Sequence, residues 1–210
     1  MTGQDIIDHF QWLVDDENVD ETRELVLLNR AYYRLCSKRI WNFLKAVDES
    51  QTITASTKTY DCPTDTMVLL QNNWYKDSLG NYSEKNKVSF QSRLKYATST
   101  KYYWYDKKNN KFALTRNPTD SEVGNTLVLD YIAKPAELTT ATSPVFDEGF
   151  HTLLAYEMMR QYYYNDQGEK NRSWNREAQS EYDEIYKDMI NWDNNLDPNQ
   201  LEADEWVNLN

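Results

Sequence analysis

The chain has 210 residues, which is enough for one hydrophobic core or for two small subdomains that share one. Its formal net charge is -11 and aromatic residues make up 14% of it, so we expect an acidic surface and a core rich in Tyr and Trp. Phosphate binding needs clustered Lys and Arg, and the composition shows no such cluster, which argues against a nucleic-acid-binding protein.

The first part of the chain is predicted to be helical. Apolar residues at helical spacing predict a short amphipathic helix over residues 4–14, and its acidic start is unlike a signal peptide. The acidic run DDENVDE that follows lacks the pattern of an EF-hand, so we expect a linker and no calcium site. Asp20 is expected to cap a second helix over residues 21–47. The basic residues of that helix are expected to form a solvated or salt-bridged face: Arg23, Arg30, Arg34, Lys38 and Arg39.

Residues 52–132 have the texture of a β-sheet, because β-branched and aromatic residues alternate with polar ones. Strands are predicted in QTITAST, TMVLLQNNWYK, KVSF, KYYWYDKKNNKFALT and NTLVLDYI. Turns are predicted at Gly80 and at Asn109 and Asn110, which tolerate a positive φ. Short strands joined by such hairpins predict an antiparallel sheet, and Pro135 removes a backbone donor and ends its last strand.

Two further helices are predicted after residue 135. Asp147 is expected to cap the first of them and Gly168 to end it. The second begins near Asn171 and carries an apolar stripe that is expected to be core: Trp174, Ala178, Tyr182, Ile185, Met189 and Trp192. Residues 197–210 then form an acidic tail with too few apolar groups to fold alone. We expect this tail to be disordered or folded onto a partner through four partner-binding residues, Leu201, Trp206, Val207 and Leu209.

These elements predict an α+β fold. Its architecture is a helical bundle, made of an N-terminal helix and two long C-terminal helices, with an inserted small antiparallel β-sheet lobe. The expected domains are the N-terminal helices of the bundle (1–50), the β lobe (51–135), the C-terminal helices (136–196) and the acidic tail (197–210).

No sequence motif for nucleotide, metal or cofactor binding is present, and we expect no cofactor, no metal and no enzymatic activity. The two cysteines, Cys36 and Cys62, fit neither a CxxC pair nor a zinc site and indicate a reducing cytoplasm. No apolar run approaches the ~20 residues that span a membrane. Two catalytic arrangements stay open: a pair of Cys36 with His151, and a pair of carboxylates that hydrolyses glycosides.

One ordered pattern covers residues 60–194. It consists of a strand entry, YDCPTDTMVLLQNNWY; a hairpin, YYWYDKKNNKFAL, followed by RNP; the strand and tether LVLDYIAKPAELT; and the helix FDEGFHTLLAYEMMRQYY before a second helix rich in Glu, Tyr and Lys. This pattern resembles the head-to-tail adaptor (connector) proteins of tailed bacteriophages. With the N-terminal helices the resemblance covers most of the chain, and the segment from DYIAKPAELT to FHTLLAYE is its most specific part.

The resemblance implies a structural virion protein of the neck between capsid and tail, assembled in the host cytoplasm. Such a protein binds beneath the portal as a twelve-fold ring, extends the DNA channel and docks the next neck or tail protein. It implies that genomic DNA passes through without specific binding during ejection, which suits an acidic surface, and that no membrane is involved. The alternative is a soluble carboxylate-based hydrolase, or a binding domain whose aromatic surface stacks on sugars or bases through Tyr102, Tyr103, Trp104 and Tyr105.

Overall fold

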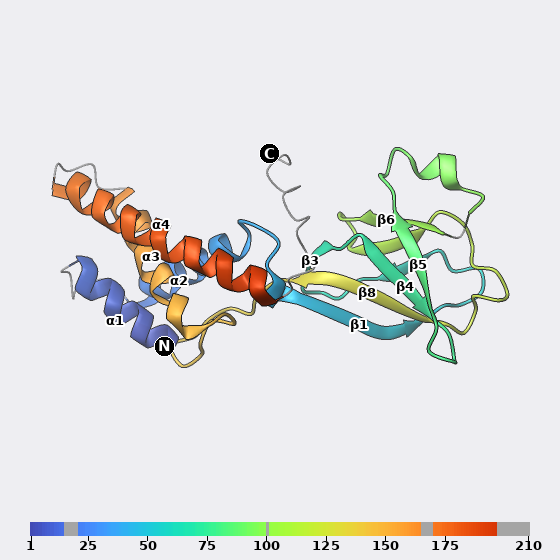
Figure 1. The fold of residues 1–210 in the computed structure, drawn as a ribbon, viewed down its shortest axis with the longest axis horizontal. Helices are drawn as coiled ribbons and strands as arrows, with labels where there is room; N and C mark the ends of the chain where they lie inside the picture. Colours follow the sequence, from blue (N-terminus) through green and yellow to red (C-terminus); the bar gives the residue numbers. More distant parts are fainter. Residues whose placement is uncertain (15–20, 100, 165–169, 197–210) are drawn as a thin grey trace. The chain divides into compact units, whose positions relative to one another are not determined.

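A computed structural model describes residues 1–14, 21–99, 101–164 and 170–196 (Figure 1). The chain divides into two compact units. Met1–Leu44 and Pro135–Asn210 form a helical unit, and Lys45–Lys134 form a barrel unit.

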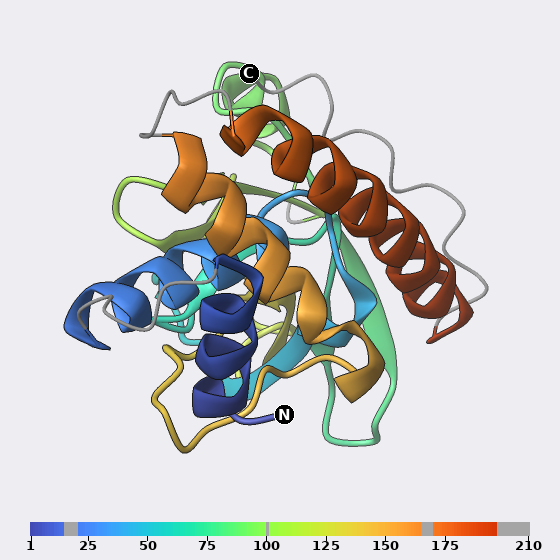
Figure 2. The ribbon, with the colours of Figure 1, turned by 90° about the vertical axis from the view of Figure 1, so that its left-hand side faces the viewer.

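The helical unit is built around helix α3 (Thr152–Tyr164), which packs against the three other α-helices of the described chain. These are α1 (Gly3–Val14), α2 (Glu21–Cys36) and α4 (Lys170–Leu196). Figure 2 shows α3 passing between α1 and α4. Because neighbours cover α3 on several sides, Leu153, Leu154, Ala155, Met158 and Met159 are all buried. Short 3-10 helices precede β1 and α3: η1 (Asn42–Leu44) and η3 (Glu148–Phe150).

The second predicted helix ends eleven residues early, at Cys36 rather than at residue 47. Its end is fixed by tertiary contacts. The indole of Trp41, which is fully buried, folds back and donates to the carbonyl of Leu35 at 3.0 Å. The carboxylate of Asp193 on α4 accepts from the backbone N–H of Asn42 at 2.7 Å and of Phe43 at 3.3 Å. These contacts hold a turn that periodicity alone could not reveal.

The barrel unit contains eight strands within its described residues, all in one sheet. They are β1 (Lys45–Thr52), β2 (Thr59–Asp61), β3 (Thr66–Leu69), β4 (Asn72–Lys76), β5 (Tyr82–Lys87), β6 (Tyr102–Asp106), β7 (Lys111–Leu114) and β8 (Thr126–Ala133). The strand order is β1-β8-β4-β5-β6-β7-β2, and β3 pairs with β8 beside β4. The pairings are antiparallel except between β5 and β6, which run parallel in the register Asn86↔Tyr102.

The two outermost strands of this order approach each other, so the sheet is a nearly closed barrel. The side-chain amide of Gln51 on β1 donates to the backbone carbonyl of Asp61 on β2. The hydroxyl of Tyr60 on β2 donates to the carbonyl of Thr57 at 3.0 Å, and this hydrogen bond holds the β1–β2 connection against β2. The interior is filled by aromatic and aliphatic side chains: Ile53, Tyr60, Cys62, Leu69, Tyr75, Tyr103, Phe112, Leu114, Leu127, Leu129 and Tyr131.

The predicted fold class, a helical bundle with a small antiparallel sheet lobe, is therefore wrong. The sheet is an eight-stranded barrel-like structure with a core of its own, and one of its pairings is parallel. Its first strand, β1, begins at Lys45, inside the region predicted as helix. β1 pairs with β8 from Lys45↔Ile132 to Thr52↔Thr126 and is the first strand in the sheet order. Because most of β1 was predicted as helix, the predicted sheet lacked this strand.

Other local predictions can be compared directly with the structure. Gly80 (φ 83°) and Asn110 (φ 51°) take the positive φ expected of their turns, whereas Asn109 does not. The predicted strand TMVLLQNNWYK is two strands, β3 and β4, and KVSF overlaps β5 only at Lys87, the last residue of that strand. Asp147 caps η3, since its side chain accepts from the N–H of Gly149. Asp20, expected as a helix cap, and Gly168, expected as a helix end, lie outside the described residues. The side chain of Trp174, expected in the core, is also outside the description.

Candidate interaction surfaces

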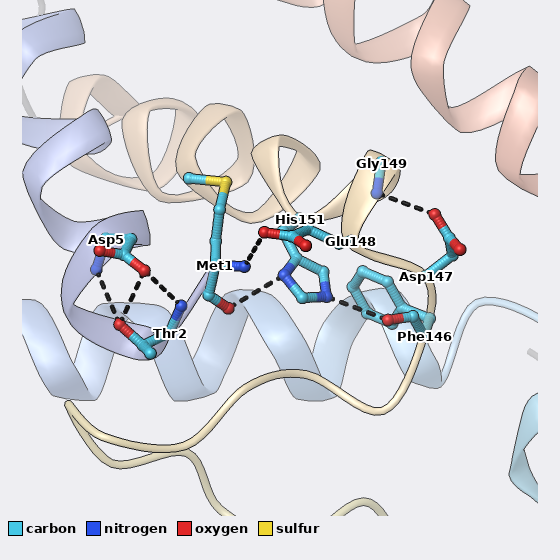
Figure 3. Close-up of polar contacts among 8 residues, drawn as sticks. All are labelled: Met1, Thr2, Asp5, Phe146, Asp147, Glu148, Gly149 and His151. Atoms are coloured by element: carbon cyan, nitrogen blue, oxygen red, sulfur yellow. Dashed lines mark hydrogen bonds and ion pairs between the residues drawn. The ribbon is translucent and has the colours of Figure 1, made fainter.

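The start of the chain is pinned to η3 by a polar network (Figure 3). Thr2 and Asp5 form a reciprocal cap at the start of α1: the N–H of Thr2 donates to the Asp5 carboxylate at 2.6 Å, and the N–H of Asp5 donates to the Thr2 hydroxyl at 3.3 Å. The amino group of Met1 lies 2.5 Å from the carboxylate of Glu148. The buried ring of His151 lies between two carbonyl oxygens, those of Met1 and Phe146, each 3.0 Å from a ring nitrogen.

This geometry speaks against the Cys36–His151 pair. The polar partners of the two ring nitrogens of His151 are the carbonyl oxygens of Met1 and Phe146, not the Cys36 thiol. Cys36 is fully buried, and burial raises the pKa of its thiol to about 12. A thiol in that state is a packing group, not a nucleophile.

The buried acids of the helical unit serve its structure. Glu157 on α3 is 1% exposed and lies 3.0 Å from the guanidinium of Arg34 and 3.4 Å from that of Arg160. Asp193 accepts from the backbone at η1 and lies 3.8 Å from the guanidinium of Arg39. Part of the predicted basic face of α2 is thus salt-bridged. Within the described residues, no group of three His, Cys, Asp or Glu side chains could hold a metal ion.

The apolar stripe of α4 is partly confirmed as core. Ala178, Tyr182 and Met189 are buried. Ile185 and Trp192 are only partly buried, and the Trp192 ring packs on Phe43 and Phe150 with centroids 5.8 and 5.5 Å away.

The connection between β5 and β6 carries a short 3-10 helix, η2 (Arg93–Tyr96), drawn in light green at the upper right of Figure 1. Phe90 stands edge-on to Trp104 with ring centroids 5.1 Å apart, and the Arg93 guanidinium lies 3.4 Å from the Phe90 ring centroid. Tyr96 packs on Tyr102 at 4.2 Å. We call this surface the β6 patch and define it by its residues: Phe90, Arg93, Leu94, Lys95, Tyr96, Lys101, Tyr102, Trp104 and Arg116.

The β6 patch has an apolar centre and a basic rim. Leu94 is 74% and Phe90 56% exposed, although both are large apolar side chains. Lys95, Lys101 and Arg116 are exposed around them. The Arg116 guanidinium also donates to the carbonyl of Thr98 at 3.0 Å and so fastens the connection to the end of β7. A surface that is ordered, apolar at its centre and charged at its edge has the anatomy of a protein interface.

A charge count over the whole chain conceals the β6 patch. Residues 85–116 contain nine Lys or Arg and one acid, Asp106. The barrel unit as a whole has thirteen Lys or Arg and ten Asp or Glu, a formal net charge of +3, whereas the helical unit has ten and twenty-four, a net charge of -14. A charge count in a sliding window would have found the cluster whose absence was inferred from composition.

The aromatic run from Tyr102 to Tyr105 does not form the row of stacking rings that the alternative function requires. Tyr103 is fully buried and stacks on Phe112 in the barrel core, and Tyr105 packs against the same core. Tyr102 and Trp104 do point outward, but Tyr96 and Phe90 lie against them. The strand therefore divides its aromatic rings between the core and the β6 patch.

A second exposed apolar group is the tip of the β4–β5 hairpin. Leu79 is 85% exposed. The carboxylate of Asp77 accepts from the N–H of Leu79 at 2.8 Å and of Asn81 at 2.9 Å, and the hydrogen bonds from Asn81 lower the pKa of Asp77. The turn is thus held in one conformation that presents Leu79 outward.

The residues proposed from sequence for partner binding, Leu201, Trp206, Val207 and Leu209, lie outside the described residues. Among the helices that are described, none is long and apolar enough to cross a membrane.

The described residues thus present two exposed apolar surfaces, the β6 patch and Leu79 at the tip of the β4–β5 hairpin. Residues 1–200 match the family model of the SU10 adaptor protein. The match spans both units, and the chain belongs to this family of bacteriophage adaptor proteins. A search of curated proteins finds no match. The resemblance to phage head-to-tail adaptors inferred from the sequence is confirmed.

Proposed function

We propose that this protein is the head-to-tail adaptor of its phage, which binds the portal as a twelve-fold ring, extends the DNA channel and docks the next neck or tail protein. The observation that carries the proposal is the family match over residues 1–200, which includes the helical unit and the barrel unit alike. The role requires no catalysis, and the protein acts in the virion neck after assembly in the host cytoplasm.

The uneven charge of the two units supports the proposal. An acidic surface repels DNA phosphates, so a channel lined by such a surface would let the genome slide without holding it. The helical unit, with its net charge of -14, has the composition for that lining. The exposed apolar groups of the barrel unit, Leu79 and the centre of the β6 patch, are suited to contacts with protein neighbours.

The experiment is to measure the composition of purified virions by quantitative mass spectrometry. The proposal predicts that the protein is present in a fixed ratio to portal, and that particles lacking it carry filled heads without tails. If purified virions contain portal and tail proteins but not this chain, the proposal is wrong.

A further inference from the structure

The barrel unit has two open backbone edges, because its sheet does not close completely. β1 and β2 stand at the two ends of the strand order, and among the described residues no ladder joins them, although the Gln51 side chain donates to the Asp61 carbonyl. β5 pairs with β6 only through Asn86 and Lys87. An unpaired strand edge presents N–H and C=O groups that can pair with a strand of another chain.

The first open edge is the side of β5 that faces away from β4 at Glu84, and we call it the β5 edge. The N–H groups of Asn86 and Val88 donate to the carbonyls of Lys101 and Tyr103 at 2.8 Å each. Because backbone groups of a strand point to alternate sides, the N–H and C=O of Glu84 point the same way, at a level where β6 has not yet begun. No described residue pairs with them there. An open groove of about 450 Å³ lies beside β5 and is lined by Ser83, Glu84, Lys85, Asn86, Lys101 and Glu122.

The second open edge is the side of β1 that faces away from β8 at Val47, and we call it the β1 edge. Val47 pairs with Asp130 on β8. The N–H and C=O of Asp130 are used on the other side of β8, where they bond to the Asn73 side chain and to the N–H of Leu70, each at 2.9 Å. Two opposite residues of an antiparallel ladder either exchange hydrogen bonds or both turn their backbone groups away. The N–H and C=O of Val47 therefore face outward, and its side chain is 62% exposed.

The two edges lie in regions of opposite charge. Residues 45–65 contain two Lys and four Asp or Glu, a formal net charge of -2, whereas residues 85–116 contain nine Lys or Arg and one Asp, a net charge of +8. In the strand order, β8 and β4 separate β1 from β5 in one direction, and β2, β7 and β6 separate them in the other. The edges therefore face different sides of the barrel, and their charges favour contact between unlike edges over contact between like edges.

We propose that neighbouring copies of this chain join through their barrel units, where the β1 edge of one copy adds as a short strand to the β5 edge of the next. Because the two surfaces differ, every copy uses both of them, and the contact repeats from copy to copy around a ring. The inference rests on the proposed function, which supplies the ring, and it names the surfaces that join its members. The neighbour covers Val47, an apolar side chain that an open edge otherwise leaves in water.

The test is chemical cross-linking between two forms of the full chain, each with one added cysteine. One form carries Val47→Cys and the other Asn86→Cys, at an exposed residue on the same face of β5 as Glu84. Bismaleimidoethane is added to each form alone and to their equal mixture, with the portal ring and without it at high protein concentration. The native Cys36 and Cys62 are buried and do not compete. We expect the mixture to give about tenfold more cross-linked dimer than either form alone.

Two variants of the Asn86→Cys form test whether the backbone makes the contact. Glu84→Pro removes the N–H that faces the groove and spares the ladder with β4, so it should lower the dimer yield about tenfold. Glu84→Ala keeps the N–H and should leave the yield within about twofold. Lys107→Cys, at an exposed lysine of the β6–β7 turn, replaces Asn86→Cys as the control for random collision and should give no more dimer than either form alone. Far-UV circular dichroism checks that the variants fold, and the comparison of the mixture with the single forms does not depend on the Pro variant.

Three results would overturn the proposal. One is equal dimer yield in a single form and in the mixture, which would indicate pairing of like edges, and another is the absence of dimer both with portal and without it. The third is an equal loss of yield in the Pro and Ala variants. Portal that binds the chain without these cross-links would leave the proposed function standing, whereas cross-links in a chain that never binds portal would contradict the proposed function and support the edge contact.

Discussion

The two units of this protein bury charge of opposite sign. The helical unit buries the acids Glu157 and Asp193 and pairs them with arginines that reach solvent. The barrel unit buries the base Lys85, which lies 2.7 Å from the carboxylate of Glu122 and 3.8 Å from the ring centroid of Tyr75. In the helical unit one partner keeps its hydration, whereas in the barrel both partners are largely removed from water.

The difference should appear as a difference in energetic cost. Removing one member of a buried ion pair leaves the other charge without compensation, and the cost depends on how far water can reach it. The side chain of Arg34 is 54% exposed, so water can solvate it if Glu157 is lost. The side chain of Glu122 is only 13% exposed, so loss of Lys85 leaves its negative charge buried without a partner or full hydration.

The largest expected effect is therefore in the barrel. Lys85→Met should lower the free energy of unfolding by about 3–5 kcal/mol, because the carboxylate of Glu122 is left buried and unpaired. Urea denaturation measures this loss. The double variant Lys85→Met with Glu122→Gln should recover part of the stability, and a single variant as stable as the original would show that the pair is hydrated.

A smaller effect is expected in the helical unit. Glu157→Gln keeps the shape of the side chain and removes its charge, so we expect a loss of about 1–2 kcal/mol in the same urea experiment. Glu181→Gln on α4, at an exposed glutamate, is the matched control and should change stability by less than about 0.5 kcal/mol. A cost for Glu157→Gln above that of Lys85→Met would reverse the comparison between the units.

The Lys85–Glu122 pair should also make stability depend on pH. Burial acts to raise the pKa of Glu122, but the hydrogen bonds from Lys85 and Thr119 outweigh it, and the pKa is lowered from the ordinary 4.5. The pair's stabilisation is therefore complete above pH 4.5 and is lost as pH falls through the lower folded-state pKa. Thermal melts between pH 7 and pH 3 should show the advantage over Glu122→Gln shrinking in acid. An advantage that stays constant to pH 3 would contradict the assignment.

The smallest effect concerns the two thiols, one in each unit. Cys36 and Cys62 are both buried, and burial raises the pKa of each to about 12. Neither should react with a thiol reagent such as Ellman's reagent at pH 8 in the folded protein, and both should react after denaturation. Fast reaction of one thiol without denaturant would identify the unit that opens locally.

The sequence predicted those elements whose signals are local. The apolar spacing of residues 4–14 defined α1, and Gly80 and Asn110 marked their turns because few other residues accept a positive φ. The break between β3 and β4 depends instead on contacts far along the chain. The Tyr103 hydroxyl donates to the carbonyl of Leu70 at 2.6 Å, and the Asn73 side chain donates to the same hydroxyl.

Barrel closure could not be predicted from local sequence signals either, because β8 pairs with β1, β3 and β4, which come from separate parts of the sequence. The two candidate interaction surfaces differ in how far the sequence predicts them. Composition singled out the C-terminal segment, including Trp206, and that choice stays a prediction. The β6 patch needed both a local charge count and the fold, because only the fold brings Phe90 against Trp104 on one outer face.

The most direct test of the central claim is native mass spectrometry of the full chain mixed with the portal ring. The account predicts one complex whose mass equals the portal ring plus twelve copies of this 25.0 kDa chain. A chain that ends at residue 196 should form this complex less completely if the C-terminal segment joins neighbouring copies. Portal that stays bare at every concentration of the full chain would contradict the claim that this protein is the ring beneath it.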